Sequence, residues 1–203
     1  MMLWFLLRGL VIGFSIAVPV GPIGVLCIRR TLAQGRVAGL VSGLGAATAD
    51  ALYGCVAGFG LTFVSRFLIG QQTWLRLVGG VFLCYLGLKT LLSRPAESEV
   101  SVGASGLLGA YVSTLFLTLT NPLTILSFAA VFAGLGVGSA GEGYLSAGVS
   151  VLGVFLGSAL WWLLLSGGVG LFRHKLNLQK LAWVNRISGA IIAGFGLLAL
   201  LNV

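Results

Sequence analysis

Long apolar stretches alternate along this chain with short polar or basic connections. With about 20 apolar residues taken as one crossing of a bilayer, the pattern predicts six membrane-spanning helices, at about 3–28, 37–63, 72–92, 106–134, 145–171 and 182–201. The segment 93–105 is the one long polar connection, and it divides the chain almost in half. The pattern therefore predicts an all-α integral membrane protein with two three-helix units, residues 1–92 and 106–203, joined by a linker over 93–105.

Composition supports the same class of protein. The 203 residues are 58% hydrophobic and 8% charged, whereas a soluble domain carries about 25% charged residues. Such a chain could not cover a soluble globule with polar surface. The 32 glycines suit helices that pack closely in a membrane bundle. The net charge of +8 does not indicate a nucleic-acid partner, because the basic residues lie between the apolar segments and not on one face.

Basic residues are distributed unevenly over the two sides of the predicted membrane. The connections after spans one, three and five carry eight of the twelve Lys and Arg residues: Arg29, Arg30, Arg36, Lys89, Arg94, Arg173, Lys175 and Lys180. The N-terminal edge and the connections after spans two and four carry Arg8, Arg66 and Arg76. Because cytoplasmic connections hold the excess of Lys and Arg, this distribution predicts that both termini lie outside the cytoplasm.

The two halves of the chain resemble each other. Three segments match in the same order, 20–27 with 120–127, 45–53 with 153–161, and 80–92 with 189–201, at offsets of 100, 108 and 109 residues. This similarity favours a duplicated three-helix unit. Because each unit has an odd number of crossings, the second copy would be inserted upside down. Inverted repeats occur in many secondary transporters, with the substrate site at the repeat interface near mid-membrane.

Prolines interrupt two predicted helices at corresponding places, Pro19, Gly21 and Pro22 in span one and Asn121 and Pro122 in span four. Proline removes a backbone donor and clashes with the preceding turn, so a helix kinks or breaks there. Unpaired backbone groups at membrane depth are tolerated where they line a cavity or are buried in protein. A single proline would indicate a packing kink, but two breaks at equivalent positions favour a substrate or ion site formed by these five residues.

Asp50 is the only acidic residue in any predicted span. A carboxylate at that depth is costly unless it faces protein or water. On a helix, Gly39 and Gly43 lie about 20° from Asp50 and Gly54 about 40°, so Asp50 should point into the bundle. Desolvation disfavours the charged carboxylate, which suits a residue that exchanges a proton or binds a substrate ammonium. The plainer interpretation is a protonated Asp50 that only hydrogen-bonds a neighbouring helix.

Other polar and aromatic side chains leave two interpretations open. Asn121 shares a helix face with Thr114, Thr118 and Thr124, and this stripe could hydrogen-bond either a substrate or another helix. Trp161 and Trp162 lie in mid-span. They could pack in the core or form the wall of a cavity.

The segment 18–54 resembles the lysine and amino-acid exporter family (LysE/RhtB type). It carries a Pro-x-Gly-Pro element, a basic turn and a glycine-rich span with Asp50, and Asn121-Pro122 is similar to the family's second element. That element is usually Asn-Pro-Lys, whereas this chain has Leu123. The resemblance implies a bacterial inner-membrane exporter of amino acids or similar small metabolites, driven by proton exchange. Any role of the family's lysine cannot be carried over to Leu123.

The sequence thus favours a secondary transporter whose partners are a small-molecule substrate, protons and the lipid bilayer, with a homo-oligomer left open. No cofactor or metal site is expected. The chain has no paired acids in its spans, no Ser with a His or Lys and no metal cluster, so an enzyme is disfavoured. The alternative functions are a small-solute channel or a membrane-complex subunit without transport activity.

Overall fold

The computed structural model describes residues 2–19, 21–59, 70–92, 104–121, 124–128, 144–172 and 178–201. Within these ranges the regular structure is helical and contains no strand, as predicted. The helices are α1 (Met2–Ala17), α2 (Pro22–Gln34), α3 (Arg36–Gly58), α5 (Gln72–Leu91), α6 (Ala104–Leu119), α8 (Tyr144–Leu171) and α9 (Leu178–Leu201). Residues 124–128 add a further helical turn.

Among the described residues, four helices are long and apolar enough to cross a membrane, namely α3, α5, α8 and α9. The pair α1 and α2 would add a fifth span if the two are counted as one bent helix. These spans coincide with five of the six predicted ones. In the fourth predicted span, 106–134, α6 ends at Leu119, and residues 129–134 lie outside the described residues.

The first predicted span is broken where its prolines lie. α1 ends at Ala17, α2 begins at Pro22, and the two helices are bent by 83°. α2 then continues to Gln34, six residues beyond the predicted end of the span. A sharp reversal follows at Gly35, whose φ of 100° lies in the left-handed region that glycine adopts without strain. α2 and α3 are therefore joined by a single residue.

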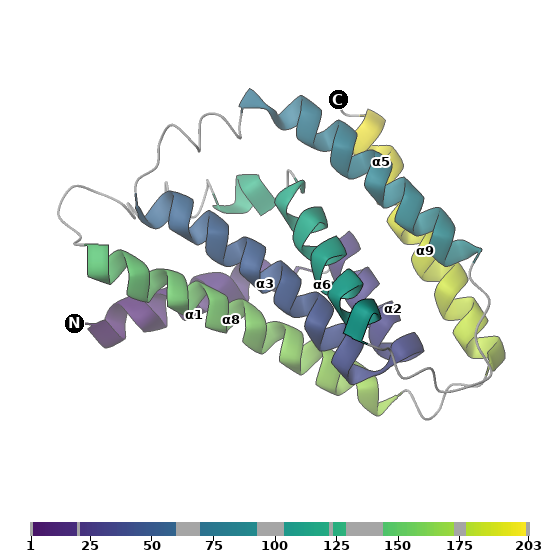
Figure 1. Cartoon of the computed structure of the whole chain (residues 1–203), viewed down its shortest axis with the longest axis horizontal. Coiled ribbons are helices and arrows are strands. Elements are labelled where there is room, and N and C mark those ends of the chain that lie inside the picture. The colour runs from purple at the N-terminus through teal and green to yellow at the C-terminus, as the bar shows by residue number, and fades with distance from the viewer. Residues whose placement is uncertain are drawn as a thin grey trace.

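Two long helices form the centre of the bundle. α3 and α8 run antiparallel, because Gly39 near the start of α3 approaches Ser166 near the end of α8, and Gly58 approaches Ala147. α1 packs on α8, and α6 packs on α3. Figure 1 shows α5 and α9 as a second antiparallel pair beside this group.

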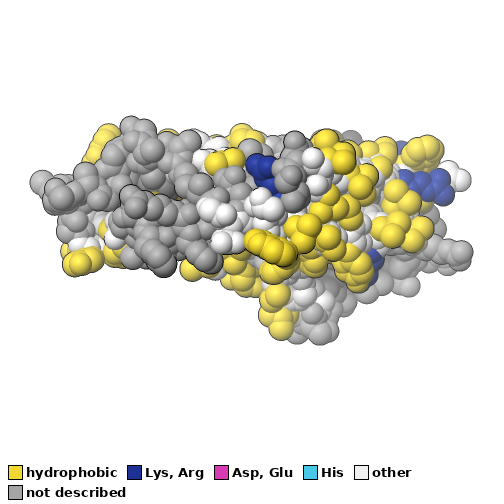
Figure 2. Space-filling model, turned by 90° about the horizontal axis from the view of Figure 1, so that it is seen from above, with side chains coloured by type: hydrophobic (Ala, Val, Ile, Leu, Met, Phe, Trp, Pro, Cys, Tyr) yellow, Lys and Arg dark blue, Asp and Glu magenta, His cyan; other side chains and the backbone are white. Residues whose placement is uncertain are grey.

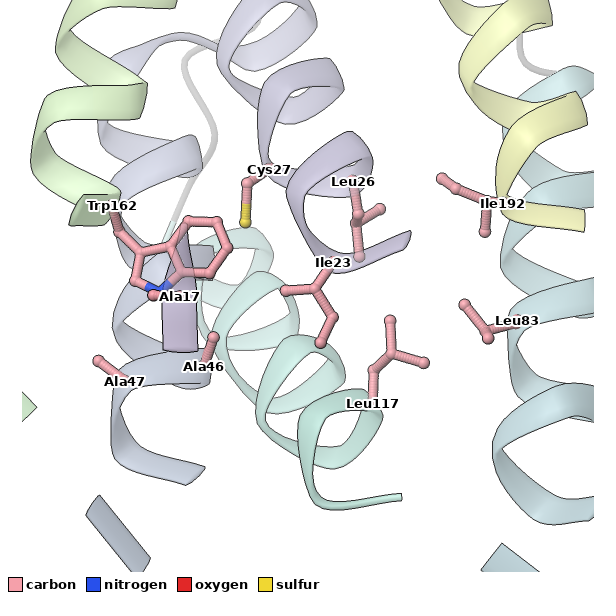
Figure 3. Packing of buried hydrophobic residues seen from close by; sticks show 10 residues of the cluster. All are labelled: Ala17, Ile23, Leu26, Cys27, Ala46, Ala47, Leu83, Leu117, Trp162 and Ile192. Atoms are coloured by element: carbon pink, nitrogen blue, oxygen red, sulfur yellow. The ribbon is translucent and has the colours of Figure 1, made fainter. Parts of the chain in front are cut away.

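Buried apolar residues from all seven of these helices tie the two groups together. The main cluster consists of Ala17, Ile23, Leu26, Cys27, Ala46, Ala47, Leu83, Leu117, Trp162 and Ile192 (Figure 3). The outer faces are apolar as well: Leu3, Trp4, Val11, Leu164, Trp183 and Leu201 are all more than half exposed. In Figure 2, apolar side chains predominate over charged ones in the described part of one face. A belt of exposed apolar side chains is what a lipid-facing surface requires.

Candidate functional site

Two cavities adjoin the break between α1 and α2. The narrow cavity has a volume of about 80 Å³, and the wide cavity has a volume of about 500 Å³. Both are lined by Pro19, Gly21, Pro22 and Asn121. Small-molecule sites usually measure about 300–1,000 Å³. The wide cavity is within this range, whereas the narrow one has room only for water or for small groups such as an ammonium and a carboxylate.

Asp50 lies in the wall of the narrow cavity. Its side chain is 3% exposed, which confirms the prediction that it points into the bundle. Ser158 of α8 donates a hydrogen bond from Oγ to Asp50 Oδ2 at 2.7 Å. One turn further along α8, Trp162 donates from Nε1 to Ser158 Oγ at 3.1 Å. The carboxyl group of Asp50 is thus connected through Ser158 to a second buried residue, Trp162.

The bond from Trp162 to Ser158 has a fixed direction. An indole N–H can only donate, and a serine hydroxyl has one proton and accepts through its oxygen. Ser158 accepts from Trp162, and its own proton is donated to Asp50 when that carboxyl is ionised. The two residues hold the Asp50 side chain in one orientation, with Trp162 forming part of the same cavity wall. Trp162 is therefore both packed in the core and a cavity residue.

The broken backbone contributes the start of α2 to the same cavity. Gly21 is the N-cap, Pro22 is the first helical residue, and the first bond of the helix runs from Val25 N to Gly21 O at 3.1 Å. The amides of Ile23 and Gly24 precede that bond, so they have no acceptor within their own helix. Both residues line the narrow cavity. The positive end of a helix dipole therefore lies near the Asp50 carboxylate.

The second break is formed around Asn121. Tyr53 of α3 donates from its hydroxyl to the carbonyl of Leu119, the last residue of α6, at 2.6 Å. Beyond this point the Asn121 amide donates to the Thr118 carbonyl, and the Asn121 carbonyl accepts from the Ile125 amide, both at 3.2 Å. The polar side chains of Thr118, Asn121, Thr124 and Ser127 line the narrow cavity.

Five of the six residues predicted from the sequence line this one cavity: Pro19, Gly21, Pro22, Asp50 and Asn121. Pro122 lies outside the described residues. Sequence reasoning did not select Ser158, and it left Trp162 open between core packing and a cavity wall. A signal for Ser158 was present, since the repeat offset of 108 residues places Ser158 opposite Asp50.

Arg30 corrects one expectation. The sequence places Arg29 and Arg30 in a polar connection, but both belong to α2. The Arg30 side chain is buried. Its guanidinium donates four hydrogen bonds of 2.7 to 2.9 Å, one to Ser42 Oγ on α3 and three to α6. The acceptors on α6 are the Ala110 carbonyl, Ser113 Oγ and Thr114 Oγ1. Arg29 Nε donates to Asn185 Oδ1 on α9 at 3.2 Å. The burial of Arg30 was not visible in the pattern because three of its partners lie 80 or more residues away.

The polar stripe of α6 accordingly divides into two parts. Thr114 is fully buried, accepts from Arg30 and donates to the Ala110 carbonyl, so it connects helices. Thr118, Asn121 and Thr124 face the narrow cavity. Thr114 therefore bonds another helix, whereas Thr118, Asn121 and Thr124 are placed where a substrate could bind.

The fold and the site together define a class of protein. It is a multi-pass α-helical membrane protein with a broken helix and a buried carboxylate around an internal cavity, an arrangement used by secondary transporters. The chain belongs to the LysE type translocator family, whose model matches residues 14–203. This confirms the resemblance found in the sequence.

Individual relatives agree with this family. The putative amino acid efflux protein YcgF of Bacillus subtilis (strain 168) is 29% identical over 92% of this chain and 90% of its own length. The threonine efflux protein of Escherichia coli (strain K12) is 24% identical over 87% of this chain and 88% of its own. The uncharacterized membrane protein YahN of Escherichia coli (strain K12) is 30% identical over 84% of this chain and 77% of its own. No solved structure matches the chain.

Proposed function

We propose that this protein is a secondary active exporter of amino acids or related small polar metabolites in a bacterial inner membrane, and that it works by proton antiport. The observation that carries the proposal is the position of Asp50, a buried acid in the wall of a cavity formed by a broken helix. The names of the relatives, putative amino acid efflux protein and threonine efflux protein, support an amino-acid substrate.

The chemistry of the narrow cavity suits a zwitterion. Asp50 would bind either a proton or the substrate ammonium, so that one displaces the other. The amides of Ile23 and Gly24, which have no acceptor within α2, would receive the substrate carboxylate, because helix N-termini favour anions. Pro19, Gly21, Pro22, Asn121 and Pro122 would form the remainder of the site. Competition at one carboxylate is sufficient to couple export to proton entry.

Alternating access would follow from two inverted three-helix repeats that move against each other. Two contacts support this architecture. Asp50 bonds Ser158, 108 residues away, and Cys84 Sγ lies 3.9 Å from the carbonyl of Ala193, 109 residues away. These separations equal the offsets that align the two halves. If a two-fold axis in the membrane plane relates the two repeats, equivalent residues that lie next to the axis contact each other. The contacts of Asp50 with Ser158 and of Cys84 with Ala193 agree with such an axis.

The pairing of helices supports the same relationship. Under the alignment, α1 corresponds to α6 and α3 corresponds to α8. The packing of α1 on α8 is then equivalent to the packing of α6 on α3, and both contacts are present. The antiparallel courses of α3 with α8 and of α5 with α9 are also those of inverted copies.

The proposed orientation, with both termini outside the cytoplasm, does not depend on Arg29 and Arg30. Without these two residues, and with Arg186 near the start of the sixth predicted span counted on the cytoplasmic side, seven basic residues lie on that side against three on the other.

Transport by the purified protein in proteoliposomes tests the proposal. Amino-acid efflux should accelerate when protons are supplied on the opposite side and should slow when a protonophore collapses the gradient. Asp50→Asn should abolish this flux while the protein still inserts in the membrane. Conductance far above carrier turnover would favour the channel instead. The absence of flux for any metabolite would favour a subunit without transport activity.

A further inference from the structure

The wide cavity differs chemically from the narrow one. Six apolar side chains contribute to its lining: Leu83, Leu117, Leu126, Phe195, Leu198 and Ala199. Among its described lining residues, the polar side chains are Thr120, Asn121 and a single charged group, Arg76, and none is acidic. This combination offers a large apolar volume with a positive charge in its wall.

Its position relates it directly to the Asp50 cavity. Pro19, Gly21, Pro22 and Asn121 line both cavities, so the two spaces adjoin at the break. The narrow cavity, at about 80 Å³, cannot contain a whole amino acid together with its side chain. The wide cavity has a volume of about 500 Å³, which is more than a small side chain such as that of threonine would fill. Among the cavities of the described residues, the wide one adjoins the Asp50 cavity and has room for the remainder of a substrate bound there.

We propose that the wide cavity is the side-chain pocket of the exporter and that it selects amino acids with a large, apolar, uncharged side chain, of leucine or phenylalanine size. This inference rests on the proposed export function and specifies its substrate class. The apolar lining gains free energy only from apolar side chains that fill it, because burial scales with the apolar area removed from water.

Charge in the cavity wall excludes other substrates. A lysine-type side chain would place its ammonium beside Arg76, and the described lining residues offer that ammonium no acidic side chain. Like charges in a low-dielectric space repel strongly. A hydroxyl side chain such as that of threonine would replace water hydrogen bonds by apolar contacts and would leave most of the volume unfilled.

A panel of substrates tests the inference. Counterflow of radiolabelled leucine, phenylalanine, threonine and lysine is measured one by one with the full-length protein in proteoliposomes. Because each methylene in an apolar pocket changes specificity by about 10–200-fold, we expect kcat/KM for leucine and phenylalanine to exceed that for threonine and lysine by about tenfold or more. Threonine or lysine as the preferred substrate would refute the side-chain pocket and leave the export function intact. The absence of flux for every amino acid would refute both.

Two variants on α9 locate the specificity. Ala199→Phe places a bulky ring in the lining of the wide cavity, whereas Ala190→Phe adds the same ring at an exposed position of the same helix outside that lining. Ala199→Phe should lower leucine and phenylalanine counterflow about tenfold and should change alanine counterflow less than about twofold. Ala190→Phe should leave all rates unchanged. An equal loss for alanine and leucine in Ala199→Phe would contradict the assignment.

If Ala199→Phe does not fold, Leu126→Ala provides the complementary change. Leu126 is 42% exposed, so truncation is tolerated more readily there than in the core. The enlarged cavity should shift the ratio of phenylalanine to leucine counterflow upward about threefold or more. Arg76→Gln should raise lysine counterflow relative to leucine, and Arg76→Lys, which keeps the positive charge, should not. An unchanged phenylalanine-to-leucine ratio together with unchanged lysine exclusion would overturn the inference.

Discussion

Arg30 of α2 donates a hydrogen bond from Nη1 to Thr114 Oγ1 of α6 at 2.7 Å, and both side chains are buried. The bond joins the two halves of the chain. The same guanidinium also binds Ser42 on α3, so Arg30 holds three helices together on one charged group. Because the oxygens of Ser42, Ala110, Ser113 and Thr114 that accept from it are neutral, these bonds depend on their number and geometry and not on an ion pair.

We expect Arg30→Gln to lower the free energy of unfolding by about 2–4 kcal/mol, because hydrogen bonds to charged groups are worth about 1.5–3 kcal/mol each and buried acceptors would lose their donor. Arg30→Lys should recover only part of the loss, since an ammonium cannot reproduce the planar fork. Thermal unfolding in detergent measures the effect. Arg186→Gln, at an exposed position on α9, is the matched control and should be close to neutral. Wild-type stability in Arg30→Gln would show that these bonds do not hold the bundle together.

Local patterns were sufficient for the helices and for the direction of Asp50. Helical periodicity placed Asp50 on the glycine face of its span, and that face does pack against α8 through Gly39 and Gly43. The chemistry of Pro19 and Pro22 likewise predicted the interruption between α1 and α2. In these cases the cause lies within a few residues of the effect, so it can be recognised without the fold.

Contacts between distant segments could not be predicted in the same way. The burial of Arg30 depends on oxygens of α6, and a basic residue after an apolar stretch ordinarily indicates a connection. The wide cavity exists because α5 and α9 stand beside α2 and α6, which no local pattern specifies. Ser158 could be predicted only in part. The offset of 108 residues between the two halves makes it the equivalent of Asp50, but its contact with Asp50 follows only if equivalent residues of the two repeats are assumed to meet.

Close packing of α5 with α9 makes a second prediction. A Cβ added at Gly87 would lie 2.5 Å from the backbone nitrogen of Ala193, whereas at Gly194 it would meet nothing within 4 Å. Gly87→Ala should therefore destabilise the protein by about 1–3 kcal/mol, because a backbone atom cannot yield as a side chain can. Gly194→Ala should be neutral or slightly stabilising, since alanine is the better helix former. Unfolding in detergent compares the two, and equal stability would contradict the described packing of α5 on α9.

The proposed orientation predicts which sides of the membrane are accessible. In a variant without native cysteines, single cysteines are introduced at Arg94, in the predicted linker, and at Tyr144, the exposed first residue of α8. A membrane-impermeant thiol reagent added to whole cells should label position 144. Position 94 should react only after the cells are opened. Labelling of position 94 in intact cells would reverse the orientation, and labelling of both from one side would contradict the six-span topology.

The Trp162–Ser158–Asp50 chain predicts a graded effect on transport. Ser158→Ala removes the donor to Asp50 Oδ2 and leaves the Trp162 N–H without its acceptor. We expect a loss of about tenfold or more in the proton-coupled rate, since small misplacements of a reacting group cost up to about 100-fold. Trp162→Phe keeps most of the ring but loses the N–H, so its loss should be smaller.

Ser150→Ala is the matched control, because that hydroxyl bonds only the carbonyl of Ser146 one turn earlier in α8. Its transport rate should equal that of the wild type. If Ser158→Ala transports at the wild-type rate while Asp50→Asn is inactive, Asp50 acts without the orientation that Ser158 provides. If both variants transport normally and only their stability falls, Asp50 is a structural link between α3 and α8, as the plainer interpretation of the sequence holds, and the proton pathway must be sought elsewhere.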